Sequence, residues 1–140
     1  MLFSRSGLNY TVKIGPGGRL ESVFAKILPQ NIGKGTGTTV ASRSWAQTLG
    51  QTIDDAGHGS GRNLGGPGGV RGKNIFPQNL SVNRGQFMRF EKYVAAQVNA
   101  GKGVFVRVVP KYNGIGTRPF EVLYQVRVDG KTMTKVFKNQ

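Results

Sequence analysis

Apolar and polar positions alternate with a period of two near the C-terminal end of the chain, which is typical of β-strands with one buried face. The pattern covers 104–109 and 120–128. Asp129 and Gly130 follow directly, and this dipeptide is typical of a two-residue hairpin turn. A last strand is therefore expected at 131–137, so the pattern predicts an antiparallel meander.

Two further apolar runs near the N-terminus, at 8–14 and 19–28, predict a first hairpin. The glycines and the proline of 15–18 predict the turn between these strands. The range 40–53 fits either a short strand or a short helix, and the range 74–76 fits a short strand.

One stretch has helical periodicity instead, and it predicts one main helix over about 82–100. Ser81 is expected to be its N-cap, because a serine side chain can accept a hydrogen bond from a free amide of the first turn. Gly101 and Gly103 are expected to end the helix. The apolar stripe consists of Phe87, Phe90, Val94 and Val98.

Glycine-rich segments separate these elements. Within 29–39, the Gly-Lys-Gly-Thr at 33–36 has a superficial likeness to a phosphate-binding loop, but the required spacing of earlier glycines is absent. A flexible connector is expected there, and 57–72 is expected to lack regular structure because of its many glycines. The order of elements predicts a single α+β domain, 1–140, with an antiparallel sheet.

Net charge narrows the function more than any other feature of composition. The 140 residues include 20 Lys and Arg but six Asp and Glu, a formal charge of +14. Such an excess favours polyanionic partners: nucleic acid, an anionic membrane surface or an acidic protein. The cations are spread along the chain, as in a folded domain with a positive surface. There is no cysteine, which excludes disulfides and zinc–thiolate sites.

The residues best suited to catalysis are concentrated around the single histidine. His58 follows Asp54 and Asp55, two of the six acidic residues, while Asn83 and Glu91 lie on the predicted helix. Imidazole titrates near neutral pH, so it can act as a general base. A solvated histidine in a glycine-rich loop is the alternative, but this concentration in a chain so poor in acids favours an active site.

A set of motifs in a specific order supports this interpretation. The motifs are Asp54-Asp55-Ala56-Gly57-His58, Leu64-Gly65-Gly66-Pro67-Gly68, Asn74-Ile75-Phe76-Pro77-Gln78, Asn83-Arg84-Gly85, Glu91, Thr117-Arg118-Pro119, Val122-Leu123-Tyr124-Gln125-Val126 and Asp129-Gly130-Lys131. Over roughly 8–137 the chain resembles the DNA/RNA non-specific endonucleases, which are ββα-metal nucleases. It is most similar to the compact bacterial branch that often forms the C-terminal toxin domain of larger secreted proteins.

The resemblance implies a ββα-metal active-site motif in which His58 is the general base that activates the attacking water. It implies that Asn83 holds magnesium, or another divalent cation such as manganese, directly, and that Glu91 holds the ion through water. The chemistry of these groups agrees, because a neutral imidazole with a pKa of roughly 6.5 can take a proton from water. Magnesium prefers oxygen ligands and keeps most of its waters.

Arginines are expected to bind the scissile phosphate. Many family members have an arginine where this chain has Ala56, so another cation must contact the substrate here. Arg43, Arg62 and Arg84 are the candidates, Arg43 through its loose match to an upstream arginine of the family. Gly59, in place of an apolar residue after the histidine, is a second departure from the family pattern.

Three more residues are expected to support the site. Asp54 and Asp55 either attract the charged form of His58 or accept hydrogen bonds from turn amides, and the sequence leaves both roles open. Gln78 is expected to bond the backbone near the site. The aromatic residues expected in the core, rather than against bases, are Trp45, Phe76 and Phe87.

These observations predict a metal-dependent endonuclease that hydrolyses DNA, RNA or both without sequence preference. A toxin domain is expected, secreted or delivered within a larger protein and acting in the cytoplasm of a target cell, with an acidic cognate immunity protein as its inhibitor. Neither a membrane span nor a signal peptide is expected in this chain. The alternatives are a non-catalytic basic nucleic-acid-binding protein, which needs only the charge, and a structural protein of a ribonucleoprotein particle.

Overall fold

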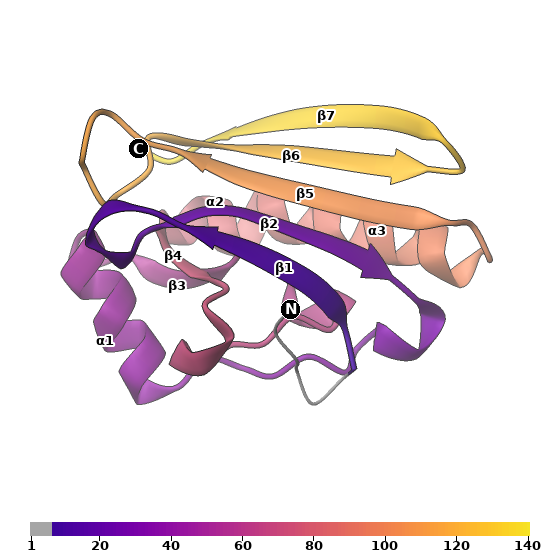
Figure 1. Ribbon diagram of the computed structural model, residues 1–140, viewed down its shortest axis with the longest axis horizontal. Coiled ribbons are helices and arrows are strands. Elements are labelled where there is room, and N and C mark those ends of the chain that lie inside the picture. The colour runs from indigo at the N-terminus through magenta and orange to yellow at the C-terminus, as the bar shows by residue number, and fades with distance from the viewer. Residues whose placement is uncertain (1–6) are drawn as a thin grey trace.

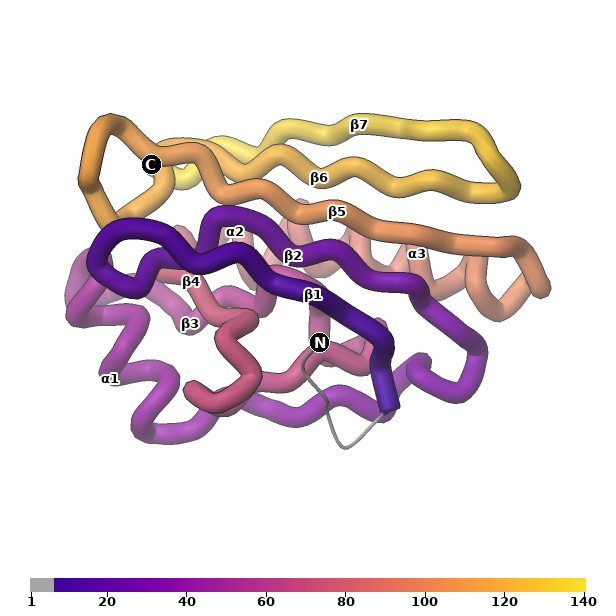
Figure 2. Tube along the Cα trace, viewed as in Figure 1, coloured from indigo at the N-terminus to yellow at the C-terminus, as the bar shows by residue number. Residues whose placement is uncertain are grey.

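A five-stranded antiparallel sheet is the largest element of the computed structural model, which describes residues 7–140 (Figure 1). Its strands run in the order β1-β2-β5-β6-β7, so the N-terminal and C-terminal hairpins form opposite edges (Figure 2). The strands are β1 (Asn9–Ile14), β2 (Leu20–Ile27), β5 (Val104–Lys111), β6 (Glu121–Val128) and β7 (Lys131–Lys138). The predicted antiparallel strands are confirmed.

The helices and a second, smaller sheet lie on one face of this large sheet (Figure 1). Alternate strand residues point to that face and are buried, as the period of two requires. Helix α3 (Met88–Asn99) and Phe87, which precedes it, bury the predicted apolar stripe against this face. Phe87, Phe90, Tyr124 and Phe137 form an aromatic cluster beneath it, with ring centroids 4.9–5.9 Å apart.

The two hairpin turns form where the sequence predicted them. Asp129 and Gly130 have φ values of 47° and 84°, the left-handed backbone that a tight two-residue hairpin turn needs. In the N-terminal hairpin, Gly17 and Gly18 also have positive φ, at 68° and 80°. Glycine adopts such conformations without a steric cost, which explains why the turn is built from it.

The ambiguous range 40–53 begins with a helix, α1 (Val40–Leu49). Thr39 caps it by accepting a hydrogen bond from the amide of Ser42, 3.0 Å away, while Ser42 Oγ accepts one from the amide of Thr39. This reciprocal capping box stabilises the first turn. Trp45 on this helix is half-buried, so its predicted place in the core is only partly realised, whereas Phe76 and Phe87 are fully buried.

The main helix begins earlier than predicted, and Ser81 is not its N-cap. Asn79 caps it instead, accepting hydrogen bonds from the amides of Ser81 and Val82 at 2.9 and 3.1 Å. Serine and asparagine both cap helices well, so the N-cap is the residue whose side chain reaches the free amides of the first turn. A short α-helical turn, α2 (Leu80–Val82), leads into a π-helical turn at 83–87 and then into α3.

The range 57–72 was expected to lack regular structure, and this is wrong in two respects. Its first two residues belong to a strand, and two short helical turns lie within it. Strand β3 (Asp55–His58) pairs with β4 (Ile75–Gln78), placing His58 opposite Ile75 and Asp55 opposite Gln78. Gly57 makes this pairing possible, because a Cβ there would overlap the side chain of Gln78. Short 3-10 turns occur at Arg62–Leu64 and Val70–Gly72, and another at Pro29–Asn31 in the expected connector.

No helix within residues 7–140 is both long enough and apolar enough to cross a bilayer.

Candidate active site

A cavity of about 710 Å³ opens beside the π-helical turn and contains most of the predicted site residues. His58, Asn83 and Glu91 all line it, together with Arg62 and Arg84. The complete lining is Gly33, His58, Arg62, Asn63, Asn83, Arg84, Met88, Glu91 and Lys92. Three segments therefore meet at one place: strand β3, the glycine-rich loop that follows it at 59–74, and the main helix.

The π-helical turn explains how Asn83 and Glu91 come to line the same cavity. They are eight positions apart, whereas an α-helix returns to the same face after about seven residues, or two turns. A π turn inserts one extra residue into the helical repeat, and such insertions occur frequently at functional sites. The turn at 83–87 therefore brings the two side chains onto one face.

The imidazole of His58 is oriented by the connector at 29–39. Its Nε2 lies 2.9 Å from the carbonyl oxygen of Thr36. A carbonyl can only accept, so Nε2 carries the proton, and in the neutral ring Nδ1 holds the free lone pair. Burial lowers the pKa of His58, the Thr36 hydrogen bond opposes this shift, and the positive charge of Arg62 lowers the pKa further. The net lowering keeps the ring neutral near pH 7, the form that a general base requires.

Asn83 is held by Asp55 from the neighbouring strand. Its Nδ2 donates to Asp55 Oδ2 at 2.9 Å. Arg84 donates to the same carboxylate twice, from Nε at 2.9 Å and from Nη2 at 2.8 Å. With its amide nitrogen fixed in this way, Asn83 has its oxygen on the side away from Asp55.

Glu91 brings a carboxylate with an unusual environment to the cavity. Its Oε2 is buried and has no hydrogen-bond partner within residues 7–140. The carboxylate packs against Gly61, where a Cβ would overlap it. Burial raises the pKa of Glu91 to about 8. A buried anion with no partner is costly, so this site favours a cation beside Glu91.

The donors present fit a hard divalent ion that keeps several water ligands. The side-chain oxygens of Asn83 and Glu91 are of the kind that magnesium prefers. Within residues 7–140 no group of three or more His, Cys, Asp or Glu side chains is placed to hold a metal.

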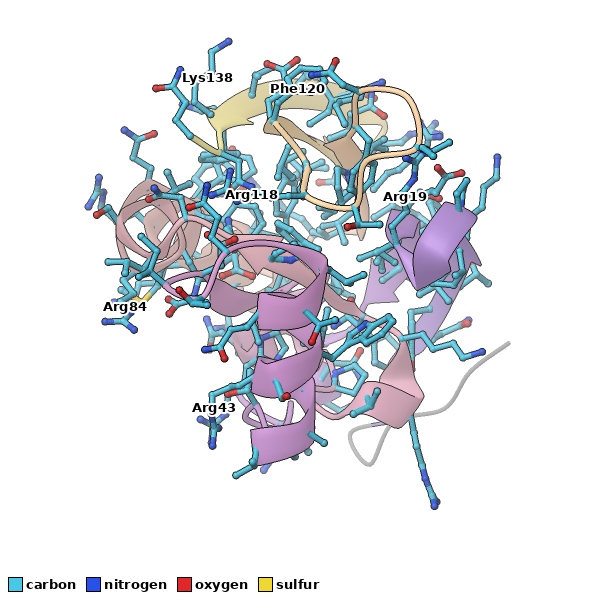
Figure 3. The ribbon with its side chains drawn as sticks, turned by 90° about the vertical axis from the view of Figure 1, so that its left-hand side faces the viewer. Arg19, Arg43, Arg84, Arg118, Phe120 and Lys138 are labelled. Carbon is cyan, nitrogen blue, oxygen red and sulfur yellow. The ribbon has the colours of Figure 1, made fainter. Side chains whose placement is uncertain are left out.

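The candidate phosphate-binding arginines do not all lie together. Arg62 and Arg84 line the cavity, but Arg43 does not. Arg43 is exposed on α1, where its Nη1 donates to the carbonyl and hydroxyl oxygens of Thr38 at 3.1 and 3.2 Å. Arg43 and Arg84 nevertheless project toward the same edge of the molecule (Figure 3). Ala56 is buried with Ala46 and Ile75 and is not among the lining residues.

Of the two roles left open for the aspartates, Asp54 has the second, capping a turn amide, whereas Asp55 bonds Asn83 and Arg84 instead. The role expected of Gln78 needs correction. Asp54 is buried and ion-paired with Arg118 at 2.8 Å, and it accepts a hydrogen bond from the amide of Gln51. It thus caps a turn amide, and no interaction between Asp54 and His58 is found. The side chain of Gln78 does not bond the backbone as expected. It is buried, and both of its polar atoms lack hydrogen-bond partners within residues 7–140.

Sequence reasoning missed several residues that shape the site. Lys92 and Asn63 line the cavity, and Thr36 orients His58 through its backbone carbonyl, which no sequence pattern can reveal. Asn74 holds the glycine-rich loop, since its side chain bonds the amide and the carbonyl of Ser60 at 2.8 and 2.9 Å and the carbonyl of Pro67 at 3.1 Å. Its place in a motif directly before β4 was the available signal.

The sequence profile that defines the family of DNA/RNA non-specific endonucleases matches residues 6–130. The chain belongs to this family. The resemblance expected from the motifs is therefore confirmed, and membership supports a nuclease, a hydrolase of phosphodiester bonds.

One relative is a protein of Dickeya dadantii (strain 3937) named probable deoxyribonuclease RhsA. The two sequences are 39% identical over 130 residues, which are 92% of this chain and 9% of that protein. This family member therefore spans only a small part of the length of the relative that it matches.

Solved structures of nucleases share the fold. NucA from Streptococcus agalactiae without metal superposes with a TM-score of 0.72 at 16% identity, covering 99% of this chain and 73% of NucA. The magnesium-bound form of NucA gives 0.70 at 15% identity, covering 95% and 73%. Sda1 nuclease with a bound zinc ion gives 0.72 at 15% identity, covering 94% and 74%. These likenesses confirm the α+β fold with its ββα-metal motif.

Proposed function

We propose that the chain is a metal-dependent endonuclease that hydrolyses DNA, and RNA as a second substrate, without sequence preference. The observation that carries this proposal is the single cavity that His58, Asn83 and Glu91 line together. A protein that only binds nucleic acid needs the charge but has no use for this combination. Nuclease chemistry uses all three, as a base, an oxygen ligand and a carboxylate.

His58 is the general base. Its Nε2 is fixed on the carbonyl of Thr36, so Nδ1 takes the proton of the attacking water. The lowered pKa of His58, caused by burial and by the charge of Arg62 against the opposing Thr36 hydrogen bond, keeps Nδ1 free near neutral pH. The 2.9 Å contact with Thr36 also holds the ring in one orientation.

Asn83 and Glu91 would hold a divalent cation. Asp55 fixes the amide of Asn83, and Gly61 leaves room for the carboxylate of Glu91. The bound ion would supply electrostatic stabilisation of the charge that develops on the phosphate and the leaving oxygen. The structural relatives contain magnesium in one case and zinc in another. We favour magnesium, or manganese, because the site offers oxygen donors and no cysteine or second histidine.

Arg62, Arg84 and Lys92 are positioned to bind the phosphates around the scissile bond. They line the cavity and are exposed, and Arg62 and Lys92 form no ion pair within the described residues. Contacts to phosphate carry no sequence information, which supports cleavage without sequence preference. We place DNA first because the relative is named a deoxyribonuclease.

The chain is proposed to be one domain of a larger, delivered toxin that acts in the cytoplasm of a target cell. Its relative is far longer, since the matched region is 9% of that protein. A non-specific nuclease endangers the cell that produces it, so an inhibitor made alongside it is expected. With a charge of +14, this domain would be recognised fastest by an acidic immunity protein.

The decisive experiment is incubation of the pure protein with plasmid DNA and with total RNA in magnesium, with and without a chelator. The wild type should degrade the substrate only when metal is present. His58→Ala should lose about 10²–10⁴-fold in rate. Arg71→Gln, which removes an exposed cation outside the cavity, should keep the normal rate. Cleavage that persists in excess chelator, or at the normal rate in His58→Ala, would disprove the mechanism.

A further inference from the structure

The face of the large sheet opposite α3 carries a pair of stacked aromatic rings. Phe24 on β2 and Phe105 on β5 have ring centroids 5.9 Å apart and an interplanar angle of 29°. Phe24 is 45% exposed, although phenylalanine is usually buried. Strand alternation accounts for the direction of both rings, since their sequence neighbours point inward and are buried.

Three cations surround these rings. The strand register places Lys26, Phe105 and Arg127 in one row across β2, β5 and β6, and it places Arg107 beside Phe24 in the next row. Lys26 Nζ lies 5.7 Å from the centre of the Phe105 ring. We call Phe24, Lys26, Phe105, Arg107 and Arg127 the outer platform.

The cations of the outer platform are not neutralised by the protein. Lys26, Arg107 and Arg127 are all exposed, and none forms a salt bridge within residues 7–140. Glu21 and Glu121 are paired with Arg19 and Lys138. Asp129, two positions from Arg127, accepts a hydrogen bond from the amide of Gly103 and forms no salt bridge within residues 7–140. A concentrated, unpaired positive charge beside flat apolar surface thus remains on this face.

No helix of the described residues covers the outer platform, because α1, α2, α3 and the small sheet all lie on the other face (Figure 1). The rings border a shallow depression of about 250 Å³, which Arg107, Gln125, Arg127 and Thr132 also line. The candidate active site lies behind the sheet, among β3, the glycine-rich loop and the main helix. The two surfaces are therefore separate.

We propose that the outer platform is a second nucleic-acid site that binds single strands. Bases would stack on Phe24 and Phe105, while Lys26, Arg107 and Arg127 would contact the backbone phosphates. Aromatic rings combined with cations are the features by which proteins hold single strands without reading sequence. A duplex keeps its base faces stacked internally, so only single strands can use the rings. The proposal goes beyond the hydrolytic site and does not depend on it.

Such a site would hold a substrate while the cavity behind the sheet cuts another part of it. It would matter most for RNA and for DNA that is already partly unwound. An acidic protein segment could also contact the three cations, but it would gain little from two stacked rings, of which Phe24 is exposed and Phe105 half-buried. The rings therefore distinguish the proposed occupant from an acidic protein partner.

The test uses His58→Ala as the background, so that the probe is not cut. Fluorescence anisotropy would measure the Kd for a labelled oligothymidylate of about 20 nucleotides, longer than the roughly 4–16 nucleotides of one single-strand site. Adding Phe24→Ala and Phe105→Ala together should weaken binding about tenfold or more, since each stacked base contributes substantially. Affinity for a blunt-ended duplex, which has no unpaired bases, should stay unchanged. Phe120→Ala removes a phenylalanine that is similarly exposed, at 42%, but lies outside the outer platform, and it should have no effect.

Further variants separate stacking from a loss of folding and test the contribution of charge. Phe24→Tyr with Phe105→Tyr keeps both rings and should retain wild-type affinity for the single strand. Arg107→Gln should weaken binding and flatten its salt dependence, whereas Arg71→Gln, an equal loss of charge elsewhere, should not. Unchanged single-strand affinity in the double alanine variant would overturn the proposal. So would equal losses for the duplex and the single strand, or a change that appears only as altered self-association in sedimentation.

Discussion

Asp55 accepts a hydrogen bond from Nδ2 of Asn83 at 2.9 Å, across the junction between β3 and the main helix. The contact settles the orientation of an amide whose two ends differ in function, because only the oxygen can bind a cation. Asp55 thus acts on the proposed metal site through Asn83, even though it is not among the residues that line the cavity.

Replacing Asp55 with alanine should therefore lower the apparent affinity for the metal ion more than it lowers the maximal rate of cleavage. Loss of such a supporting contact typically costs about 10–100-fold in metal affinity or activity. We expect the magnesium concentration for half-maximal cleavage to rise, with much of the rate recovered at high magnesium. Glu121→Ala, which breaks a partly exposed ion pair with Lys138, is the control, because neither residue lines the cavity. An Asp55→Ala enzyme with an unaltered magnesium titration would contradict this role.

Gly61 is predicted to be essential for the position of Glu91. Its backbone, with φ of −62° and ψ of 154°, suits alanine, but the added Cβ would overlap the Glu91 carboxylate. Gly61→Ala should lower kcat by about 100-fold, the effect expected when a group is displaced by roughly 1 Å. Circular dichroism should show an intact fold.

The matched control is Gly69→Ala in the same glycine-rich loop. At Gly69 a Cβ would meet no atom of residues 7–140 within 4 Å, and φ is −86°. This variant should cleave at the wild-type rate. Equal activity of the two alanine variants would show that the Glu91 carboxylate can move without loss.

The pH dependence of cleavage should reflect the lowered pKa of His58. Burial and the charge of Arg62 both disfavour the protonated ring, and the hydrogen bond to Thr36 only partly offsets them. The base must be neutral, so the rate should fall as pH drops through a value below roughly 6.5, the ordinary pKa of histidine. Arg62→Gln removes a positive charge, raises the pKa of His58 and should move this acid limb to higher pH. A limb that stays in place, measured as kcat/KM at saturating magnesium, would argue against His58 as the titrating base.

The local elements of the fold could be predicted from sequence because their signals are local. The period of two in 104–109 and the turn at Asp129 and Gly130 depend only on neighbouring residues. The range 40–53 was ambiguous because its helix, α1, buries only three residues. Strand β3 was missed because it is four residues long and contains a glycine, which local propensity disfavours.

Contacts between distant segments explain the other gaps. The pairing of Asp54 with Arg118 joins residues 64 positions apart, so no spacing rule could assign Asp54 to structure and Asp55 to the site. An active site around His58 was expected from the concentration of acids near it, but the separate roles of His58, Asn83 and Glu91 came from the family resemblance. Arg62 and Arg84 could be separated from Arg43 only by the cavity that they line.

Arg118 is predicted to matter for stability rather than for catalysis. Its Nε and Nη2 donate to Asp54 at 2.8 and 2.9 Å, and Nη1 donates to the carbonyl of Asn139 at 2.6 Å. The Asp54 side chain is 1% exposed, so Arg118→Met would leave a buried carboxylate without its partner. Breaking such a pair costs about 3–5 kcal/mol in the free energy of unfolding. Urea denaturation measures this loss, and Arg71→Met is the control on an exposed arginine.

The stability lost in Arg118→Met should depend on pH with a definite sign. Burial raises the pKa of Asp54, but the hydrogen bonds from Arg118 and from the Gln51 amide, with the charge of Arg118, lower it overall. A carboxyl with a lowered folded pKa stabilises the fold above its unfolded pKa of about 3.9 and loses this contribution as pH falls further. The unfolded states have the same pKa, so the gap depends on the pKa of Asp54 in the two folded states. It should be full near pH 7 and shrink as pH falls through the pKa of Asp54 in the variant, which is higher than in the wild type because Arg118 no longer lowers it. A gap that is constant with pH would show that packing, not charge, is what Arg118 contributes.

The proposed toxin role predicts a specific pattern of harm inside cells. Inducing the wild-type domain alone in a bacterial host should reduce viability and fragment the nucleoid, because its cleavage has no sequence requirement. His58→Ala should be tolerated at equal expression, since it keeps the +14 charge and the fold but lacks the base. The comparison therefore separates harm by catalysis from harm by a basic protein coating nucleic acid, which the charge alone could cause. If both forms are equally toxic, charge is responsible; if both are harmless with intact nucleoids, the toxin role is wrong even where cleavage occurs in vitro.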